Sequence, residues 1–390
     1  MAGRIGKTIA VITGSRADFG HLAPVMRAIA ADPALTLRVV VCGQHLDPRF
    51  GNTWQAVAAE GFEIAAKVDF GLTDDSPRAV TEATGRGVTR MAETFATLKP
   101  DICVLLGDRY EIFAAATAAH LTPILIAHIY GGEVTEGAFD DAFRHAISKM
   151  ATLHCVAAEP YAARLRQMGE DPAQIHTVGV LSLDGLIGLL DRKQLAADLG
   201  LDLSGRLFVV TYHPVTRAAD GGVAGMKALV AALAAYSDAA VVYTGVNSDP
   251  GHAALQKSLA ADVAAHPGRR KLFDSLGHRR YLSAVKAADA VIGNSSSGID
   301  EAPALGTPTV NIGDRQKGRL RAASVIDCGE TAAEITDAIE QVLAPVFRVT
   351  AAQVEPPYGR GGAAAKIVAV LKSADPSQLS RKRFHDIIGA

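Results

Sequence analysis

A chain of 390 residues is too long for one ordinary compact core and predicts two domains. Its 39 basic and 41 acidic residues leave a formal net charge of −2, so no global field favours nucleic acid or an anionic membrane as a partner. Any anion-binding site must therefore be a local arrangement of side chains and backbone groups.

The hydropathy pattern predicts a protein of the cytoplasm. No run approaches the ~20 apolar residues of a membrane span. The basic N-terminus is followed by too short an apolar stretch for a signal peptide. Cys42, Cys103, Cys155 and Cys328 are scattered without a CxxC pair, which favours small buried side chains over disulfides or a metal site.

Short apolar runs alternate with segments of helical periodicity along most of the chain. Because the runs are continuously apolar, we expect parallel strands whose two faces are both covered by helices. The first set of expected strands covers Lys7–Thr13, Leu37–Cys42, Asp101–Leu106, Pro123–Ile129 and His154–Ala157, with helices that include His21–Ala31 and Glu111–His120.

A helical connector, predicted over Leu183–Leu203, separates this set from a second one. The sequence therefore predicts two doubly wound α/β domains, at 1–185 and 186–370, and a helical tail at 371–390. In that tail the basic cluster 381–383 is expected to be a solvated helix end. The second set of expected strands covers Leu207–Tyr212, Ala239–Thr244, Lys271–Phe273, Ala290–Gly293, Thr307–Ile312 and Ala323–Ile326.

The segment Thr13–Gly20 follows the first expected strand. Its glycines allow a tight turn, and the start of the next helix favours an anion. The segment has neither the GxGxxG spacing of a dinucleotide site nor the Gly-Lys-Ser/Thr of a P-loop, which disfavours NAD and ATP. We expect Arg16 and Asp18 to contact a ligand, although Asp18 alone would also suit a helix cap.

Carboxylates dominate the next two strand ends. Asp108 follows the strand at 101–106, and four carboxylates follow a glycine pair in the segment His128–His145. Asp140 and Arg144 there fall on one helix face. The preference for acidic residues at the start of a helix explains one such carboxylate, but not four in one segment. We therefore expect acid–base chemistry in the first domain. No tight His/Asp spacing stands out, and no metal is expected.

In the second half, His213 stands at a strand end, where Pro214 prevents immediate helix continuation. The segment Gly293–Glu301 then opens a strand into small hydroxyl and glycine residues before a helix, as a diphosphate cradle would. The residues expected to bind a nucleotide there are Ser295, Ser296, Ser297, Gly298 and Glu301, with Glu301 on the ribose hydroxyls.

Taken in order, these segments resemble the hydrolysing UDP-N-acetylglucosamine 2-epimerases of bacterial sialic acid and legionaminic acid synthesis. The resemblance covers almost the whole chain. It implies the GT-B fold, two Rossmann-like doubly wound parallel-sheet domains with an interdomain active-site cleft. The matching segments are Gly-Ser-Arg-Ala-Asp at 14–18, Gly-Asp-Arg-Tyr-Glu at 107–111, the Gly-Gly-Glu segment through Arg144-His145, His-Pro-Val-Thr at 213–216, Gly-Asn-Ser-Ser-Ser-Gly at 293–298 and Gly-Asp-Arg-Gln-Lys-Gly-Arg at 313–319.

The resemblance implies an elimination and a hydration. A carboxylate removes the proton on C2 of a UDP-linked 2-acetamido sugar, UDP leaves C1, and water adds to the resulting glycal as a proton returns to the other face of C2. The substrate is UDP-N-acetylglucosamine or UDP-N,N′-diacetylbacillosamine, no cofactor is needed, and a homo-oligomer (dimer or tetramer) is expected. By motif, the implied site residues are Asp108, Asp140, Arg144 and His213 for catalysis, and Arg16, Asp18, Ser295, Ser296, Ser297, Gly298, Glu301 and Arg315 for substrate binding.

This chain departs from many relatives by having Tyr130 where they have glutamate. Because tyrosine cannot act as a carboxylate base, Glu133 or Glu136 is expected to substitute. Tyr130, Phe139 and Phe143 are candidate apolar walls for a 6-deoxy sugar. The alternatives are a non-hydrolysing 2-epimerase, a GT-B glycosyltransferase and a non-catalytic nucleotide-sugar binding protein.

Overall fold

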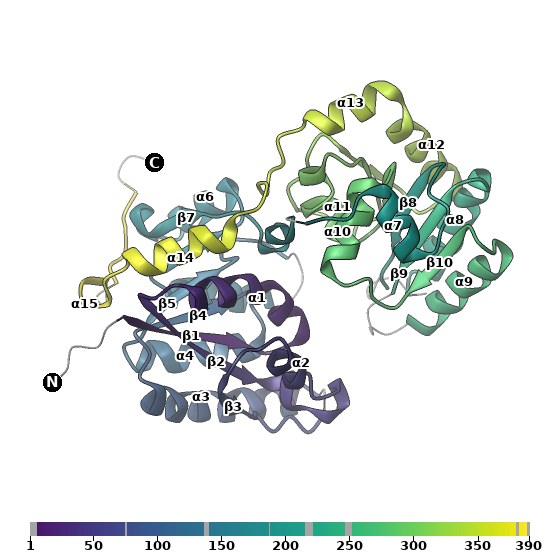
Figure 1. Cartoon of the computed structure of the whole chain (residues 1–390). Coiled ribbons are helices and arrows are strands. Elements are labelled where there is room, and N and C mark those ends of the chain that lie inside the picture. The colour runs from purple at the N-terminus through teal and green to yellow at the C-terminus, as the bar shows by residue number, and fades with distance from the viewer. Residues whose placement is uncertain are drawn as a thin grey trace. The chain divides into compact units, whose positions relative to one another are not determined.

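The computed structural model describes residues 6–74, 76–135, 140–186, 188–214, 221–245, 252–379 and 382–387. The chain forms two α/β units (Figure 1). Unit 1 comprises Met1–Asp184 and Gly362–Ala390, and unit 2 comprises Gly185–Gly361.

Unit 1 is built on a seven-stranded parallel sheet in the order β3-β2-β1-β4-β5-β6-β7. Its strands are β1 (Lys7–Thr13), β2 (Leu35–Cys42), β3 (Ile64–Val68), β4 (Ile102–Leu106), β5 (Leu125–Ile129), β6 (Leu153–Val156) and β7 (Ile175–Thr177). Its helices are α1 (Arg16–Ala31), α2 (Trp54–Ala59), α3 (Pro77–Leu98), α4 (Tyr110–Leu121), α5 (Asp140–Met150), α6 (Glu159–Gln167), α14 (Ala363–Ser373) and α15 (Pro376–Leu379).

Unit 2 repeats this architecture with a six-stranded parallel sheet in the order β10-β9-β8-β11-β12-β13. Its strands are β8 (Leu207–Thr211), β9 (Ala240–Thr244), β10 (Arg270–Phe273), β11 (Ala290–Gly293), β12 (Thr309–Ile312) and β13 (Val325–Cys328). Its helices are α7 (Arg192–Leu199), α8 (Val223–Leu233), α9 (His252–Ala265), α10 (His278–Ala287), α11 (Ser297–Asp300), α12 (Ala332–Leu343) and α13 (Pro345–Gln353).

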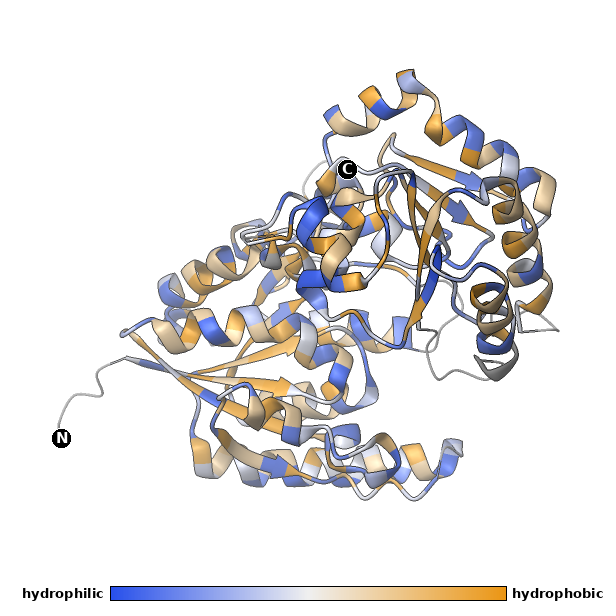
Figure 2. Ribbon diagram, turned by 45° about the vertical axis from the view of Figure 1, so that its right-hand side comes forward, coloured by the Kyte–Doolittle hydropathy of each residue, from blue (hydrophilic) through white to orange (hydrophobic). Residues whose placement is uncertain are grey.

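Each sheet has a hydrophobic core on both of its faces. In β1, Ile9 and Val11 pack into one core while Ala10 and Ile12 pack into the other, because successive side chains of a strand point to opposite faces. Figure 2 shows the same pattern: the strands are mostly orange, whereas the helices alternate orange and blue along their length. The predicted doubly wound parallel sheets are therefore confirmed.

The strand order shows which strand ends border the expected ligand site of each unit. In unit 1 the chain runs outward from β1 toward β3 on one side and from β4 toward β7 on the other. In unit 2 the corresponding neighbours are β8 and β11. Such a switch point leaves a crevice beyond the carboxyl ends of the two strands, where doubly wound domains bind ligands.

The expected boundaries differ in part from the structure. The first unit ends at Asp184, one residue before the expected position, but the chain returns to it at Gly362 rather than leaving a separate tail from 371. The reason is apolar packing: Ile367 and Leu371 of α14 belong to the same core as α1 (Figure 1). In the tail, α15 ends at Leu379, and the described residues 382–387 are not helical.

The predicted connector Leu183–Leu203 is not one helix. The structure shows a 3₁₀ turn at Leu181–Gly185 and then α7, which begins at a capping box formed by Asp191 and Gln194. The cap fixes the helix start because each side chain bonds the backbone N–H of the other residue.

No helix within the described ranges combines the length and apolar character needed to cross a bilayer.

Candidate active site

Beyond β1 and β4, a buried carboxylate lies beside the turn that begins α1. Ser15 caps α1 by accepting a hydrogen bond from the N–H of Asp18 at 3.3 Å, and the Asp18 carboxylate accepts one from the N–H of Gly14 at 3.2 Å. Asp18 is only 6% exposed. Burial raises the pKa of Asp18 to about 6, Arg109 opposes this rise, and Glu111 adds to it. Asp18 is thus a group that titrates near neutrality.

Glu111, at the start of α4, is the fully buried partner of this turn. Its carboxylate accepts hydrogen bonds from Nε and Nη2 of Arg109 at 3.2 and 3.0 Å. The chain passes so close that a Cβ at Gly43 would lie 2.5 Å from the Glu111 Cγ, and Gly43 also has a φ of +53°. Glycine is therefore required at 43, and Arg109 and Glu111 form a fixed ion pair beneath Asp18.

Asp108 and α5 meet at the same edge of the sheet. Arg144, which is 7% exposed, donates a hydrogen bond to the carboxylate of Asp108. Its guanidinium also donates to Asp141 at 3.3 Å and to the hydroxyl of Thr135 at 3.1 Å. The structure thus brings together two of the predicted catalytic residues, Asp108 and Arg144. The buried guanidinium of Arg144 holds the carboxylate of Asp108.

Asp140, one turn before Arg144, belongs to the same electrostatic cluster. Burial raises the pKa of Asp140, the negative charge of Asp108 raises it further, and Arg109 opposes the rise. Burial likewise raises the pKa of Asp108, against the attraction of Arg144 and Arg109. A carboxylate that holds its proton more tightly than usual is a stronger base, and its acid form persists to a higher pH.

His128, at the end of β5, links the turn after β4 to helix α5. Its Nε2 lies 2.8 Å from the carbonyl oxygen of Gly107, so this nitrogen carries the proton and donates. Its Nδ1 lies 3.0 Å from the hydroxyl of Ser148 on α5 and accepts. Burial lowers the pKa of His128 to about 3, so the ring is neutral. It therefore positions the cluster and carries no charge.

Tyr130 is an anchor in this structure. Its hydroxyl accepts a hydrogen bond from the N–H of Leu181 at 2.7 Å, and its ring meets His21 edge-on at a centroid distance of 6.0 Å. Its φ of +67° is unusual for a residue with a side chain. The hydroxyl is thus engaged in holding the chain at the end of unit 1.

The remaining residues of the glycine-pair segment are only partly described. Glu133 is half-buried, directly after Gly132. Phe143 stacks on Phe113 with centroids 4.7 Å apart. Glu136 and Phe139 lie outside the described residues.

In unit 2, Asn294 joins the ends of β8 and β11. Its side chain accepts from the N–H of His213 at 2.7 Å and donates to the His213 carbonyl at 2.9 Å. Its own carbonyl accepts from Arg315 at 3.3 Å and from Gln316 at 2.9 Å. Burial, followed by the nearby charge of Arg315, lowers the pKa of His213 to about 4, so its imidazole is neutral at pH 7.

The serine segment after β11 forms the rest of this site. The Ser297 hydroxyl donates to the carboxylate of Glu301 and accepts from the hydroxyl of Tyr281 at 2.6 Å. Glu301 is 8% exposed. A Cβ at Gly298 would lie 2.7 Å from Cγ2 of Thr309, so a residue without a side chain is required where α11 approaches β12. The Ser297–Glu301 bond orders this turn.

The predicted residues therefore fall into two groups by unit. Asp18, Asp108, Asp140 and Arg144 lie at the carboxyl ends of β1 and β4 or on α5, whereas Arg16 is exposed on the first turn of α1. The unit 2 group consists of His213, Ser295, Ser296, Ser297, Gly298, Glu301 and Arg315, with Ser295 and Ser296 half-buried. Among the described residues, no group of three or more metal-ligating side chains is placed to hold an ion.

Sequence reasoning did not single out four residues that support these groups: Arg109, Glu111, His128 and Asn294. All four stand inside the matched segments or directly beside a site residue. The signal in the sequence was their closeness to a predicted site residue. A hydrogen bond to a residue distant in the chain leaves no pattern in the sequence.

Known proteins resemble this chain in sequence and in fold. The family described as UDP-N-acetylglucosamine 2-epimerase matches residues 27–372. A GDP/UDP-N,N′-diacetylbacillosamine 2-epimerase (hydrolyzing) of Campylobacter jejuni is 37% identical over 82% of this chain and 84% of its own length. A UDP-N,N′-diacetylbacillosamine 2-epimerase (hydrolyzing) of Legionella pneumophila is 32% identical over 86% of this chain and 89% of its own.

The fold agrees with a solved UDP-GlcNAc 2-epimerase from Neisseria meningitidis, crystallised with UDP-GlcNAc. The TM-score is 0.77 at 20% identity, covering 94% of this chain and all of that one. Together with the two doubly wound parallel sheets, this likeness confirms the expected GT-B fold. The family match extends over most of both units. The chain belongs to the UDP-N-acetylglucosamine 2-epimerase family of enzymes.

Proposed function

We propose that this enzyme is a hydrolysing 2-epimerase, which converts a UDP-linked 2-acetamido sugar into UDP and the free manno-configured sugar. The observation that carries the proposal is the pair Asp108 and Asp140. Both carboxylates have a raised pKa, Asp140 in part because of the charge on Asp108, and Arg144 holds Asp108 from the same helix as Asp140. Two coupled carboxylates suit a reaction that removes one proton from a carbon and returns another.

In the first step, a carboxylate takes the C2 proton while the C1–O bond to UDP breaks, so that the electron pair of the C–H bond forms the C1=C2 double bond. In the second step, the oxygen of water adds to C1 and water gives up one proton to a carboxylate, while a carboxylic acid delivers a proton to the opposite face of C2. The C2–H is weakly acidic, so holding the reacting groups in place must contribute much of the rate. Asp108 and Asp140 are the proposed pair, and half-buried Glu133, in the glycine-pair segment before α5, is a third candidate.

The UDP group is proposed to bind unit 2. Small residues at Ser295–Gly298 let backbone and hydroxyl groups approach a diphosphate, and Arg315 supplies positive charge beside His213. Glu301, a buried carboxylate already oriented by Ser297, suits the two hydroxyls of a ribose. Stabilisation of the departing UDP would thus come from these nearby groups and not from the overall charge of the protein, which is near zero.

We propose UDP-N,N′-diacetylbacillosamine as the sugar nucleotide, ahead of UDP-N-acetylglucosamine. The support is that hydrolysing enzymes named for the former are 37% and 32% identical to this chain over most of its length. The product, 2,4-diacetamido-2,4,6-trideoxymannose, would serve the synthesis of a nonulosonic acid of the legionaminic type. The N-acetylglucosamine substrate would serve sialic acid instead.

Incubation of the protein with each UDP-sugar in deuterated water tests the proposal. We expect UDP release and a free manno-sugar that carries deuterium at C2. Because one relative is named for a GDP-sugar or a UDP-sugar, the GDP-linked bacillosamine derivative is assayed beside them. Intact, epimerised UDP-sugar would instead indicate a non-hydrolysing epimerase, and tight UDP binding without turnover would indicate a binding protein.

A further inference from the structure

The C-terminal segment 382–387 crosses the end of α5. The ammonium group of Lys382 donates hydrogen bonds to three backbone carbonyls there: Ser148 at 3.1 Å, Lys149 at 2.8 Å and Ala151 at 2.5 Å. Helix ends leave such carbonyls without intrahelical partners, and a cation also complements the negative end of the helix dipole. Helix α5 is thus capped by a residue more than 230 positions later in the chain.

Lys382 is itself held by a buried carboxylate. Glu170 is 1% exposed, and its oxygens lie 2.5 Å from the ammonium of Lys382, 2.7 Å from that of Lys149 and 2.8 Å from Nε2 of His154. Burial works to raise the pKa of Glu170, but these three donors together lower it to about 2. A buried charge is costly when a partner is lost, so this cluster fixes where Lys382 lies.

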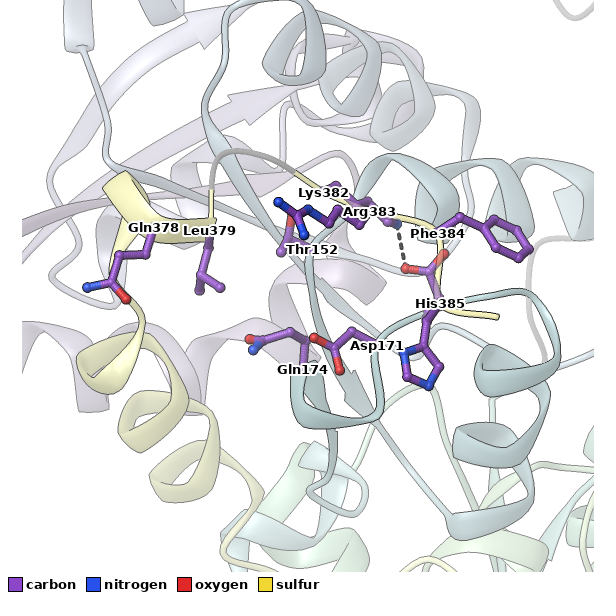
Figure 3. Close-up of a pocket in the computed structure, with 10 residues that line it drawn as sticks. Thr152, Asp171, Gln174, Gln378, Leu379, Lys382, Arg383, Phe384 and His385 are labelled. Carbon is purple, nitrogen blue, oxygen red and sulfur yellow. Dashed lines mark ion pairs between the residues drawn. The ribbon is translucent and has the colours of Figure 1, made fainter. Parts of the chain in front are cut away.

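Two further contacts dock the segment on unit 1. The N–H of His385 donates to the carbonyl of Gly169 at 2.9 Å, and the ring of Phe384 covers Gly169 where any Cβ would collide with it. The Lys149 ammonium stands 4.8 Å from the centre of that ring. Lys382 and Arg383 line a cavity of about 340 Å³ together with Asp171 and Gln174. Figure 3 shows Asp171 and Gln174 below these two residues, with the Lys382 ion pair dashed.

The other end of α5 carries the catalytic cluster. Asp140 is its first residue, and Arg144 one turn later holds Asp108. One further turn on, Ser148 bonds His128, whose other nitrogen holds the carbonyl of Gly107 beside Asp108. A shift or fraying of α5 would therefore move both catalytic carboxylates relative to each other.

We propose that segment 382–387 is part of the catalytic apparatus, with Lys382 as a positioning residue that fixes α5 and so aligns Asp140 and Arg144 with Asp108. The inference rests on the proposed function in one respect, namely that these three residues serve the reaction. Unlike a purely structural strap, a positioning residue should affect kcat far more than KM.

The chain supplies its own matched control. Lys7, at the start of β1, caps α14 in the same way, by donating to the carbonyls of Leu371, Lys372 and Ala374. Helix α14 carries no predicted site residue. Lys7→Met therefore removes a cap of the same kind from a helix of the same unit without touching the catalytic cluster. Arg383→Met removes the neighbouring exposed charge, for which no ion pair is seen among the described residues.

The experiment compares these variants in the full-length chain. It measures kcat and KM with the sugar nucleotide that the wild type turns over, and backbone amide exchange over residues 140–150 and 363–373. We expect Lys382→Met to lower kcat roughly 10- to 100-fold with little change in KM, since small misplacements cost that much, and to accelerate exchange in α5. Lys382→Arg should restore most of the activity.

Lys7→Met should accelerate exchange in α14 only and, like Arg383→Met, leave kcat near the wild-type value. Lys382→Gln, which keeps N–H donors, is measured in parallel so that kcat is available even if Lys382→Met does not fold. Wild-type kcat in Lys382→Met or Lys382→Gln overturns the inference, and so does a loss of kcat in either variant with unchanged exchange in α5. If the wild type turns over no sugar nucleotide, the proposed function fails instead, and the exchange comparison alone decides whether Lys382 holds the helix.

Discussion

Arg144 hydrogen-bonds the carboxylate of Asp108 although 36 positions separate them in the chain. The bond joins the end of β4 to the first half of α5, and the guanidinium is almost completely shielded from water. Burial raises the pKa of Asp108 while Arg144 opposes that rise. The pair therefore sets how readily Asp108 ionises, and the chemistry of the cluster depends on this balance.

Replacing Arg144 by methionine should move the acidic limb of the kcat/KM pH profile to higher pH. Without the cation, the pKa of Asp108 rises further, so a higher pH is needed to ionise it. The profile is measured between pH 5 and pH 9, with Arg144→Lys as the control that keeps the charge but loses the planar fork. An acidic limb that stays in place would show that Asp108 does not act in its ionised form.

Asp108→Asn and Asp140→Asn should each reduce kcat by about 10²- to 10⁴-fold, the usual worth of a positioned acid or base. UDP affinity should stay close to the wild-type value, because the proposed nucleotide residues lie in unit 2. Steady-state kinetics and UDP titration check both points. Asp375→Asn, in the half-buried turn before α15, is the control; activity retained by either cluster variant would remove that residue from the mechanism.

Asp18→Asn should make the protein more stable than the wild type at pH 7.5, by up to about 2–3 kcal/mol, and less so at pH 4.5. The pKa of Asp18 is raised from 3.8 to about 6 by burial, so the folded state binds more protons than the unfolded state between these values. The contribution of Asp18 to the stability of the wild type is fully present below pH 4 and is lost as the pH rises through 6.

Chemical denaturation at the two pH values measures this difference. The control is Asp32→Asn, since hydrogen bonding to Lys372 lowers the pKa of half-buried Asp32 and this variant should be slightly destabilised instead. Equal effects of Asp18→Asn at both pH values would contradict the assignment of a near-neutral pKa.

Tyr130→Phe should keep kcat within about threefold of the wild type and cost about 1–3 kcal/mol in the free energy of unfolding. The hydroxyl accepts the Leu181 N–H, and its removal leaves the donor of a buried residue unsatisfied. Kinetics and denaturation of the same preparation separate the two effects. A 100-fold loss of kcat with unchanged stability would instead give the phenol a chemical role.

Glu301→Gln should weaken UDP binding roughly tenfold to 100-fold, as expected for losing charge-assisted hydrogen bonds to a ribose. Calorimetric titration with UDP measures it. Asp300→Asn is the matched control, because this adjacent carboxylate pairs with Arg319 at 3.1 Å and is assigned no contact with the nucleotide. If both variants bind UDP alike, Glu301 does not bind the ribose.

The central strands could be predicted closely from the sequence. The runs Lys7–Thr13 and Ala290–Gly293 match β1 and β11 residue for residue, because strands covered on both faces are continuously apolar. The edge strand β3 was not predicted, since four of its five residues are only half-buried or exposed and it includes Lys67. Strand β7, also at an edge, is three residues long and has no fully buried residue.

The site was predictable only where chemistry leaves a local pattern. Asp108 and Asp140 stood out because carboxylates gather at strand ends, and both lie in the observed cluster. The role of Glu111 could not be predicted, because it depends on the close approach of Gly43, which is distant in the sequence. The prediction that the 381–383 cluster is a solvated helix end is wrong for Lys382, because its partners are carbonyls of α5.

The return of the chain to unit 1 at Gly362 has a consequence for synthesis on the ribosome. The whole of unit 2 is synthesised before α14, the helix that completes the core of unit 1, so the α14-facing side of α1 stays uncovered until α14 has been translated. A chain that stopped before Lys382 would contain every strand of both sheets among the described residues and still lack the cap on α5.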